Sequence, residues 1–184
     1  MPVQTPICDF GKKALPFELK STDNKIISLD DIKGENGTLI MFICNHCPYV
    51  KAVTKEIVED CNELKKIGIN SVAICSNDFI NYPEDSFDNM IKFSKDNQFS
   101  FPYLQDETQK IAKTYDAVCT PDFFGYDKDL GLQYRGRLRE LKNFIPVKDG
   151  ESDLLKAMKQ IAKTGKGPQD QIPSAGCGIK WKYD

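Results

Sequence analysis

Two apolar runs joined by one amphipathic helix constrain the fold of this chain more than any other feature. Residues 38–43 and 69–75 each have the length and apolar character of a buried β-strand. Between them, residues 48–67 place apolar side chains at three- and four-residue steps, which predicts a helix with one buried face. Pro48 is tolerated in the first turn of that helix, and Gly68 ends it. Strands that alternate with helices indicate an α/β sheet.

Further patterns complete the predicted fold. They indicate two hairpins, three more helices and one short extended piece, over residues 17–28, 122–135, 86–97, 111–115, 152–162 and 101–104. Asp106 and Ser152 cap the helices that follow them. Pro102 argues against a central place in the sheet for the extended piece. Residues 166–184 form a Gly- and Pro-rich tail that we expect to pack on or near the rest. The expected whole is one domain, residues 1–184, with a mixed β-sheet, helices on both faces and an N-terminal β-hairpin.

Composition and charge exclude several broad classes of protein. The 184 residues carry a formal net charge of -2 and have a pI near 5.5, so nothing draws the chain to nucleic acid or to an anionic membrane. The longest apolar run is far too short to span a bilayer. The first residues lack the basic and apolar segments of a secretory signal. We therefore expect a cytoplasmic protein with no nucleic-acid partner and no membrane partner.

The sequence Cys44-Asn45-His46-Cys47 stands where the first apolar run meets the helix. Residues three apart share a helix face, and the partial positive charge of a helix N-terminus favours a thiolate. These conditions suit a pair of cysteines that opens and closes a disulfide. A zinc site usually needs four nitrogen or sulfur ligands, whereas the chain has no second Cys-x-x-Cys and only one histidine. We therefore expect a redox dithiol, with no metal and no other cofactor.

His46 directly precedes the second cysteine of the pair. As an imidazolium near the sulfurs it would stabilise the thiolate and thereby the reduced dithiol, which makes the disulfide a stronger oxidant. The alternative is a surface histidine in a tight turn. The sequence thus favours an oxidant over a strong reductant.

Seven cysteines occur in the chain, but only Cys44 and Cys47 form a motif. Cys177 is an auxiliary candidate, because glycines on both sides permit movement or close backbone approach. It can serve as a distant resolving cysteine; alternatively, Ile179 and Trp181 simply clamp down the tail around it. The other cysteines are expected to be buried packing residues: Cys8, Cys61, Cys75 and Cys119.

Several stretches, the first of which contains the dithiol, resemble the peroxiredoxin-like redoxins, which are related to alkyl hydroperoxide reductase and thiol-specific antioxidant proteins (AhpC/TSA). They are Met41–Val50, Phe101–Leu104, Cys119–Phe124, Tyr134–Arg137 and Gly176–Trp181. The resemblance implies a three-layer thioredoxin-like fold, in which a cis-proline loop faces the dithiol. Thr120-Pro121 stands where that loop is expected. A cis-proline there would hold the backbone of Thr120 exposed to pair with an incoming disulfide substrate.

The resemblance leaves the order of the two sulfurs open. By thioredoxin logic Cys44 is the exposed nucleophile and Cys47 resolves the mixed disulfide, and this is the order that we expect. By peroxiredoxin logic Cys47, followed by Pro48, is the peroxidatic cysteine. The Pro-x-x-x-Thr-x-x-Cys signature of that family is absent, however, because Ile40 and Cys44 stand at its proline and threonine positions.

The function expected from these residues is that of an enzyme, a thiol–disulfide oxidoreductase that cycles the Cys44–Cys47 dithiol. Its substrate would be a protein or small-molecule disulfide, thiol or peroxide, and a thiol reductant would be its partner. One alternative is a peroxiredoxin-like thiol peroxidase, and another is a redox-sensing domain without turnover. Arg135 and Arg137 are candidates for supplying positive charge, although surface ion pairing is the simpler expectation for each.

Overall fold

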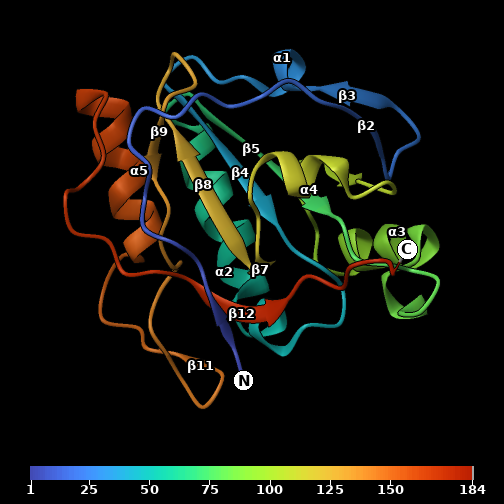
Figure 1. The fold of residues 1–184 in the computed structure, drawn as a ribbon. Coiled ribbons are helices and arrows are strands. Elements are labelled where there is room, and N and C mark those ends of the chain that lie inside the picture. The colour runs from blue at the N-terminus through green and yellow to red at the C-terminus, as the bar shows by residue number, and fades with distance from the viewer. Residues whose placement is uncertain (184) are drawn as a thin grey trace.

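The computed structural model describes residues 1–183 and is built around one seven-stranded mixed sheet (Figure 1). From edge to edge its strands are β3 (Ile26–Ser28), β2 (Glu18–Ser21), β6 (Tyr103–Gln105), β5 (Ile69–Cys75), β4 (Gly37–Phe42), β8 (Asp122–Tyr126) and β9 (Leu132–Tyr134). β5 runs parallel to β4 and β6, and the other neighbouring strands are antiparallel. The mixed sheet and both predicted hairpins, β2–β3 and β8–β9, are confirmed.

Helices cover both faces of this sheet, as predicted (Figure 1). α2 (Pro48–Lys65), α3 (Phe87–Asp96) and α5 (Asp153–Thr164) lie on one face, and α1 (Leu29–Ile32) and α4 (Lys110–Thr114) lie on the other. The α/β prediction with layered helices is therefore correct. Within residues 1–183, no helix combines the length and the apolar character that crossing a bilayer requires.

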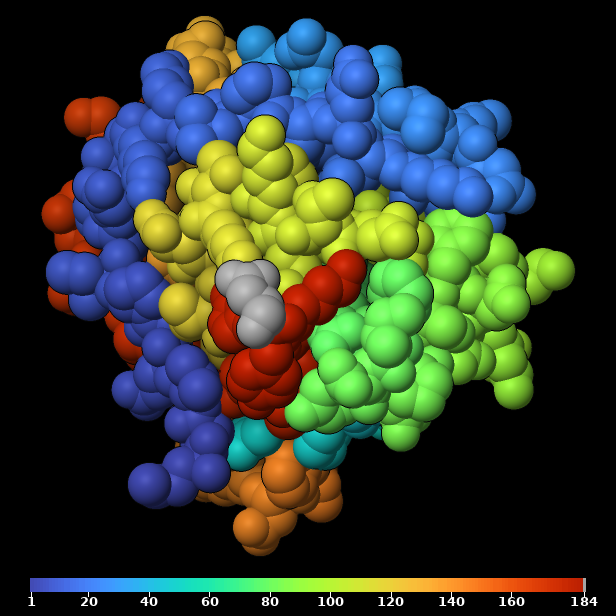
Figure 2. Space-filling view, turned by 45° about the vertical axis from the view of Figure 1, so that its right-hand side comes forward, coloured from blue at the N-terminus to red at the C-terminus, as the bar shows by residue number. Residues whose placement is uncertain are grey.

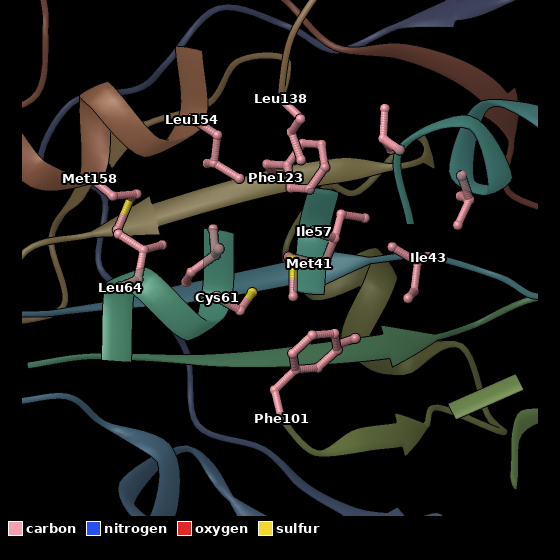
Figure 3. Packing of buried hydrophobic residues seen from close by; sticks show 14 of the residues in the cluster. Met41, Ile43, Ile57, Cys61, Leu64, Phe101, Phe123, Leu138, Leu154 and Met158 are labelled. Atoms are coloured by element: carbon pink, nitrogen blue, oxygen red, sulfur yellow. The ribbon is translucent and has the colours of Figure 1, made fainter. Parts of the chain in front are cut away.

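The central strand β4 contributes to both layers of the core. Leu39 and Met41 pack into the cluster beneath α2 and α5, whereas Ile40 and Phe42 pack into the cluster beneath α1 and α4. Figure 3 shows Met41 on the first face, beside side chains from α2. All four side chains are buried, and each burial contributes about 1.5–3 kcal/mol. A strand that is buried on both faces gives a continuous apolar run, which is why the sequence located it.

The extended piece predicted at residues 101–104 is present as β6, but the prediction that it lies away from the centre of the sheet is wrong, because β6 lies between β2 and β5. Pro102 precedes the first residue of β6, so the ladder does not need the N–H that proline lacks. Its carbonyl oxygen still accepts a hydrogen bond from the backbone N–H of Ala73, at 3.0 Å. A proline directly before a strand is therefore compatible with a central position.

A small antiparallel sheet, which the sequence does not predict, joins both ends of the chain to its middle. Its strands are β1 (Val3–Gln4), β12 (Ala175–Gly178) and β7 (Cys119–Thr120), with β12 in the centre. β12 lies beside β7 and contacts α2 (Figure 1). The predicted tail, residues 166–184, thus contributes a strand; Asp184 lies outside the described residues. A separate ribbon pairs β10 (Leu141–Lys142) with β11 (Ile145–Pro146).

Candidate active site

Cys44 and Cys47 lie in the turn that leads from β4 into α2. β4 ends at Phe42, and Cys47 is the N-cap residue of α2, directly before Pro48 in the first helical turn. Proline fits there because the first N–H groups of a helix have no partner within it. Both cysteines are free thiols, and only 1% and 0% of their surfaces are exposed. The predicted thiol pair thus lies at a helix N-terminus, but it is closed to solvent.

The Thr120–Pro121 peptide bond is cis, as predicted. It joins β7 to β8 and places Thr120 next to both cysteines. Cys44 Sγ lies 3.4 Å from Thr120 Oγ1, and Cys47 Sγ lies 3.2 Å from the Thr120 carbonyl oxygen. The structure thereby brings together four of the residues that the sequence singles out.

Thr120 is buried, contrary to the expectation that its backbone faces solvent. β12 pairs with β7 along the edge that a substrate strand would need, with Cys177 opposite Thr120. Gly176 permits this close approach, because a Cβ atom at that position would clash with the Thr120 carbonyl oxygen. The sequence could not show this pairing, since β12 consists of small residues that are not typical of strands.

The surroundings of Cys47 favour its thiolate. The Cys44 thiol donates to the Cys47 sulfur and is the largest cause of a pKa that is lowered from 9.0 to about 4. Burial opposes this shift, whereas further donors support it: the Cys177 thiol, the Thr120 hydroxyl and the Val50 N–H. The Thr120 carbonyl oxygen is an acceptor and favours the protonated form of Cys47. The net effect is a lowered pKa, so Cys47 is the more acidic of the two thiols.

Cys44 is the member of the pair that keeps its proton. Its hydrogen bond to Cys47 raises the pKa of Cys44 well above 9.0, and burial and the nearby Asp85 carboxylate add to the rise. The two sulfurs therefore hold a single proton between them. This charge distribution favours the order that the peroxiredoxin resemblance implied, with Cys47 as nucleophile.

His46 contacts a carboxylate beside the pair. Its Nδ1 atom lies 2.7 Å from Asp85 Oδ2, and its ring is stacked parallel to that of Tyr82 with centroids 6.2 Å apart. The imidazole is half-buried and does not lie fully on the surface. His46 is not among the groups that lower the pKa of Cys47. The influence of His46 on the thiolate stays a prediction.

Asp85 is the residue that the sequence analysis missed. It ends the short 3₁₀ helix η1 (Pro83–Asp85), and its buried carboxylate accepts hydrogen bonds from the Asn45 N–H (2.7 Å) and from Asn77 Nδ2 (2.8 Å). The Asn45 side chain in turn accepts one from the hydroxyl of Tyr103 in β6, at 2.7 Å. These bonds fix the Cys-x-x-Cys turn against the sheet. No sequence signal marks Asp85, whereas Asn45 lies inside the motif and could have been singled out there.

Cys44, His46 and Asp85 form the one cluster, among residues 1–183, whose atoms could act as metal ligands. One atom from each lies within 4.8 Å of the others. Zinc in proteins is typically held by four nitrogen or sulfur ligands, and here only three groups come together, one of them a carboxylate. This donor set fits a hydrogen-bonded thiol pair better than a zinc site, and the expectation of no metal stays a prediction.

Arg135 is buried in a structural ion pair. Its Nε and Nη2 atoms donate to the Asp122 carboxylate at 3.2 and 2.9 Å, and its guanidinium lies over the Phe124 ring. Nη2 also donates to the carbonyl oxygen of Asp116. The surface pairing that the sequence suggested for Arg135 is therefore wrong, because the side chain is committed inside the protein.

Arg137 lies closer to the surface, where it donates from Nε to Asp153 at 2.7 Å. It lines a pocket of about 250 Å³, together with Pro121 and Tyr49. Arg137 thus stands beside the cis-proline and remains a candidate for contacting an anionic part of a substrate.

Three of the four cysteines assigned to packing are buried: Cys61, Cys75 and Cys119. Burial is the largest cause that raises the pKa of Cys61 and of Cys75 to about 12, so these thiols stay protonated. Cys8 is only half-buried, and burial again is the main cause that raises its pKa to about 11.

Comparison with known proteins places these features in a family. A family model described as AhpC/TSA matches residues 10–137 of the chain. An uncharacterized conserved protein from Geobacillus kaustophilus is 44% identical, with a TM-score of 0.93, and the match covers 100% of this chain and 98% of that one. A hypothetical protein from Sinorhizobium meliloti is 31% identical, with a TM-score of 0.91 and 100% of both chains covered.

A more distant structure confirms the fold. The thioredoxin domain of a thiol-disulfide oxidoreductase from Bacteroides vulgatus is 15% identical, with a TM-score of 0.58, and the match covers 68% of this chain and 86% of that one. Likeness at this level of identity shows the fold alone, and the fold is thioredoxin-like. The comparison with curated proteins found no match.

Proposed function

The chain belongs to the AhpC/TSA family, and on that premise we propose that it is a thiol–disulfide oxidoreductase whose redox centre is the Cys44–Cys47 pair. The observation that carries the proposal is the position of the two free thiols at the N-terminus of α2, where both sulfurs contact Thr120 directly before the cis-proline. Cys47 is held as a thiolate at the N-terminus of α2, and Cys44 is the protonated thiol beside it. A thiolate is the form that attacks a disulfide, and a second thiol within reach resolves the product.

The proposed cycle begins at Cys47. Its thiolate attacks one sulfur of a substrate disulfide, a mixed disulfide forms, and the other substrate sulfur leaves as a thiolate. Cys44 then loses its proton and attacks Cys47 Sγ, which releases the second substrate sulfur and leaves a Cys44–Cys47 disulfide. The substrate gains two electrons, and a thiol reductant restores the dithiol. This cycle needs no redox group in the protein besides these two cysteines.

The same steps in reverse oxidise a substrate dithiol, and we propose this as the favoured direction. A dithiol whose thiolate is stabilised is harder to oxidise, so the corresponding disulfide is a stronger oxidant. From the sequence alone, His46 is the expected source of this stabilisation. The donors that surround Cys47, above all the Cys44 thiol, now supply a sufficient cause.

Access is part of the proposed mechanism, because both sulfurs are buried. A substrate strand can pair with Thr120 only after β12 has left β7. The proposed reaction therefore includes a local opening of β12, and the pocket beside Pro121 is the surface from which a substrate would approach.

A thiol peroxidase is the second candidate, favoured by the position of the Cys47 thiolate directly before Pro48. There the thiolate would attack one oxygen of a hydroperoxide, so that Cys47 becomes a sulfenic acid and the other oxygen leaves as hydroxide or alkoxide. Cys44 would then condense with the sulfenic acid, with loss of water, to give the same disulfide.

Paired serine variants test the proposal. The Cys44→Ser/Cys177→Ser variant keeps Cys47, and the Cys47→Ser/Cys177→Ser variant keeps Cys44. With insulin as the disulfide substrate, we expect a mixed disulfide to accumulate in the first variant and not in the second. The opposite result would assign the attack to Cys44.

Turnover by the wild-type protein separates the remaining alternatives. Repeated reduction of insulin, or repeated oxidation of a reduced unfolded protein, supports the oxidoreductase. Consumption of hydrogen peroxide without any exchange with protein disulfides would replace it by the peroxidase. A single oxidation that no thiol reductant reverses would identify a sensor.

A further inference from the structure

Cys177 faces the redox pair from the strand that covers it. Cys177 lies directly opposite Thr120 in the antiparallel β12–β7 ladder. Directly opposed residues of such a ladder project their side chains to the same face. The Thr120 hydroxyl lies 3.4 Å from Cys44 Sγ, so the Cys177 side chain is directed to the same pair of sulfurs. It packs against the buried cluster that contains Cys44 and Cys47.

The surrounding contacts hold β12 in this register. On one side the Thr5 N–H donates to the Ser174 carbonyl oxygen at 2.9 Å, and the Ser174 hydroxyl donates to the Pro121 carbonyl oxygen at 2.8 Å. On the other side the Lys180 N–H donates to Asn77 Oδ1 at 2.9 Å. Figure 2 shows the C-terminal segment in red, set between the blue N-terminal segment and the yellow and green segments. Hydrogen bonds on both sides of Cys177 therefore fix its position opposite Thr120.

We propose that Cys177 is a third redox-active cysteine, which exchanges with the Cys44–Cys47 disulfide to form a Cys47–Cys177 disulfide. The inference rests on the proposed function, since it requires that the first pair become oxidised. β12 then acts as a substrate strand within the same chain: it pairs with the strand before the cis-proline and presents its own cysteine to Cys47.

The exchange conserves electrons. The Cys177 thiolate attacks Cys47 Sγ, and the Cys47–Cys177 bond forms as the Cys44–Cys47 bond breaks. Cys44 leaves as a thiolate and takes up a proton, which replaces the one that Cys177 lost. The oxidant that made the first disulfide is the only one required.

The exchange changes where the oxidising equivalents are stored. Cys44 and Cys47 are buried, whereas Cys177 is half-exposed. A bond to Cys177 therefore moves one end of the disulfide toward the surface, where a thiol partner can reach it. In the reduced protein, burial and then the neighbouring Cys47 raise the pKa of Cys177 to about 11. Its attack is accordingly expected to become faster as the pH rises.

Tryptic mapping of the Cys44→Ser variant tests the inference. Trypsin leaves Cys47 in the peptide 34–51 and Cys177 in the peptide 167–180. After oxidation with diamide, we expect these two peptides to be linked, and the link to be lost in Cys44→Ser/Cys177→Ser. The matched control is Cys44→Ser/Cys119→Ser, which removes a cysteine of the same ladder whose thiol donates to the Pro121 carbonyl oxygen instead. This control should keep the link.

The wild-type protein provides a test that does not depend on a variant. After equilibration in a glutathione redox buffer, we expect both the internal 34–51 disulfide and the link to 167–180. An internal disulfide without any link, in the wild type and in Cys44→Ser, would overturn the role of Cys177 and leave the proposed function intact. A protein that forms neither disulfide would overturn both.

Discussion

Asp85 lies buried beneath His46, with its Oδ2 atom 2.7 Å from the imidazole Nδ1. A buried carboxylate is tolerated only when hydrogen bonds or ion pairs replace the water that it has lost. Here these partners come from the Cys-x-x-Cys turn, through His46 and the Asn45 N–H, and from Asn77 after β5. One carboxylate therefore ties the Cys-x-x-Cys turn to the loop that follows the neighbouring strand.

Asp85→Asn should destabilise the reduced protein by about 1–3 kcal/mol, because a buried donor would be left facing other donors. The asparagine oxygen can still accept from the Asn45 N–H, but its amide nitrogen would face His46 and Asn77. Urea unfolding in the presence of reductant measures the change. The exposed neighbour offers a matched control, Glu84→Gln, which should alter stability by less than about 0.5 kcal/mol. Equal stability of the Asp85→Asn variant and the wild type would contradict the role given to Asp85.

Cys44→Ala should raise the pKa of Cys47 well above its value of about 4, because the Cys44 thiol is the largest cause of the depression. The ultraviolet absorbance of the thiolate, followed through a pH titration of the reduced protein, reports the midpoint. Cys61→Ala is the control, since Cys61 is a buried cysteine elsewhere in the core and should leave the midpoint unchanged. An unchanged midpoint in Cys44→Ala would show that other groups hold the thiolate.

The reduction potential of the pair should fall by about 30 mV per pH unit between about pH 5 and pH 8. In that range Cys47 has lost its proton, since its pKa is about 4, whereas Cys44 keeps its own, since its pKa lies well above 9.0. Reduction therefore takes up two electrons and one proton. Equilibration with glutathione buffers over a pH series gives the slope. A slope of about twice that value would mean that both thiols are protonated.

Gly176→Ala should speed alkylation of Cys47 in the reduced protein, because the new Cβ would clash with the Thr120 carbonyl oxygen and push β12 off β7. Strain of about 1–3 kcal/mol corresponds to about a 5- to 150-fold change in the open population. Gly178→Ala is the matched control, since its Cβ would meet only Val3 Cγ2 at an ordinary 3.5 Å. Equal alkylation rates for the two variants would show that β12 does not limit access.

Arg135→Met should cost about 3–5 kcal/mol of folding stability, because Asp122 would remain buried without its partner. Burial already raises the pKa of Asp122 with the arginine in place. The double variant Arg135→Met/Asp122→Asn should recover much of the loss, as measured by urea unfolding. If Arg135→Met alone were as stable as the wild type, the structural role of Arg135 would be contradicted, and Arg135 would again be a candidate for catalysis.

The sequence predicted correctly those elements whose buried faces impose a regular spacing of apolar residues. β4 and α2 follow from apolar spacing alone, and α5 follows from its apolar spacing together with the Ser152 cap. The central place of β6 does not follow from its pattern, because Pro102 argues against it although the proline precedes the strand. β12 was missed because its pairing depends on the absence of side chains at Gly176, and a glycine in a tail indicates flexibility as readily as close contact.

The candidate site was predictable to the extent that its chemistry is local. Cys44, Cys47 and the cis-proline could be located from motif and resemblance. The protonation order could not, because besides the hydrogen bond between the two thiols it depends on burial and on Asp85 and Cys177, which reach the pair from distant parts of the chain. Whether Thr120 is open to a substrate is also a property of the assembled fold.

β1 pairs with β12, and β12 pairs with β7, so residues from both ends of the polypeptide meet over the thiols. Any sequence joined to either end, such as a purification tag or a fusion partner, would be anchored within a few residues of β12 or of the strand β1 that pairs with it. A tag joined before residue 1 would pull on β1, and a tag joined after residue 184 would pull on β12. The apparent reactivity of this protein should therefore depend on how it is tethered, and immobilisation through an internal surface lysine would be the gentler choice.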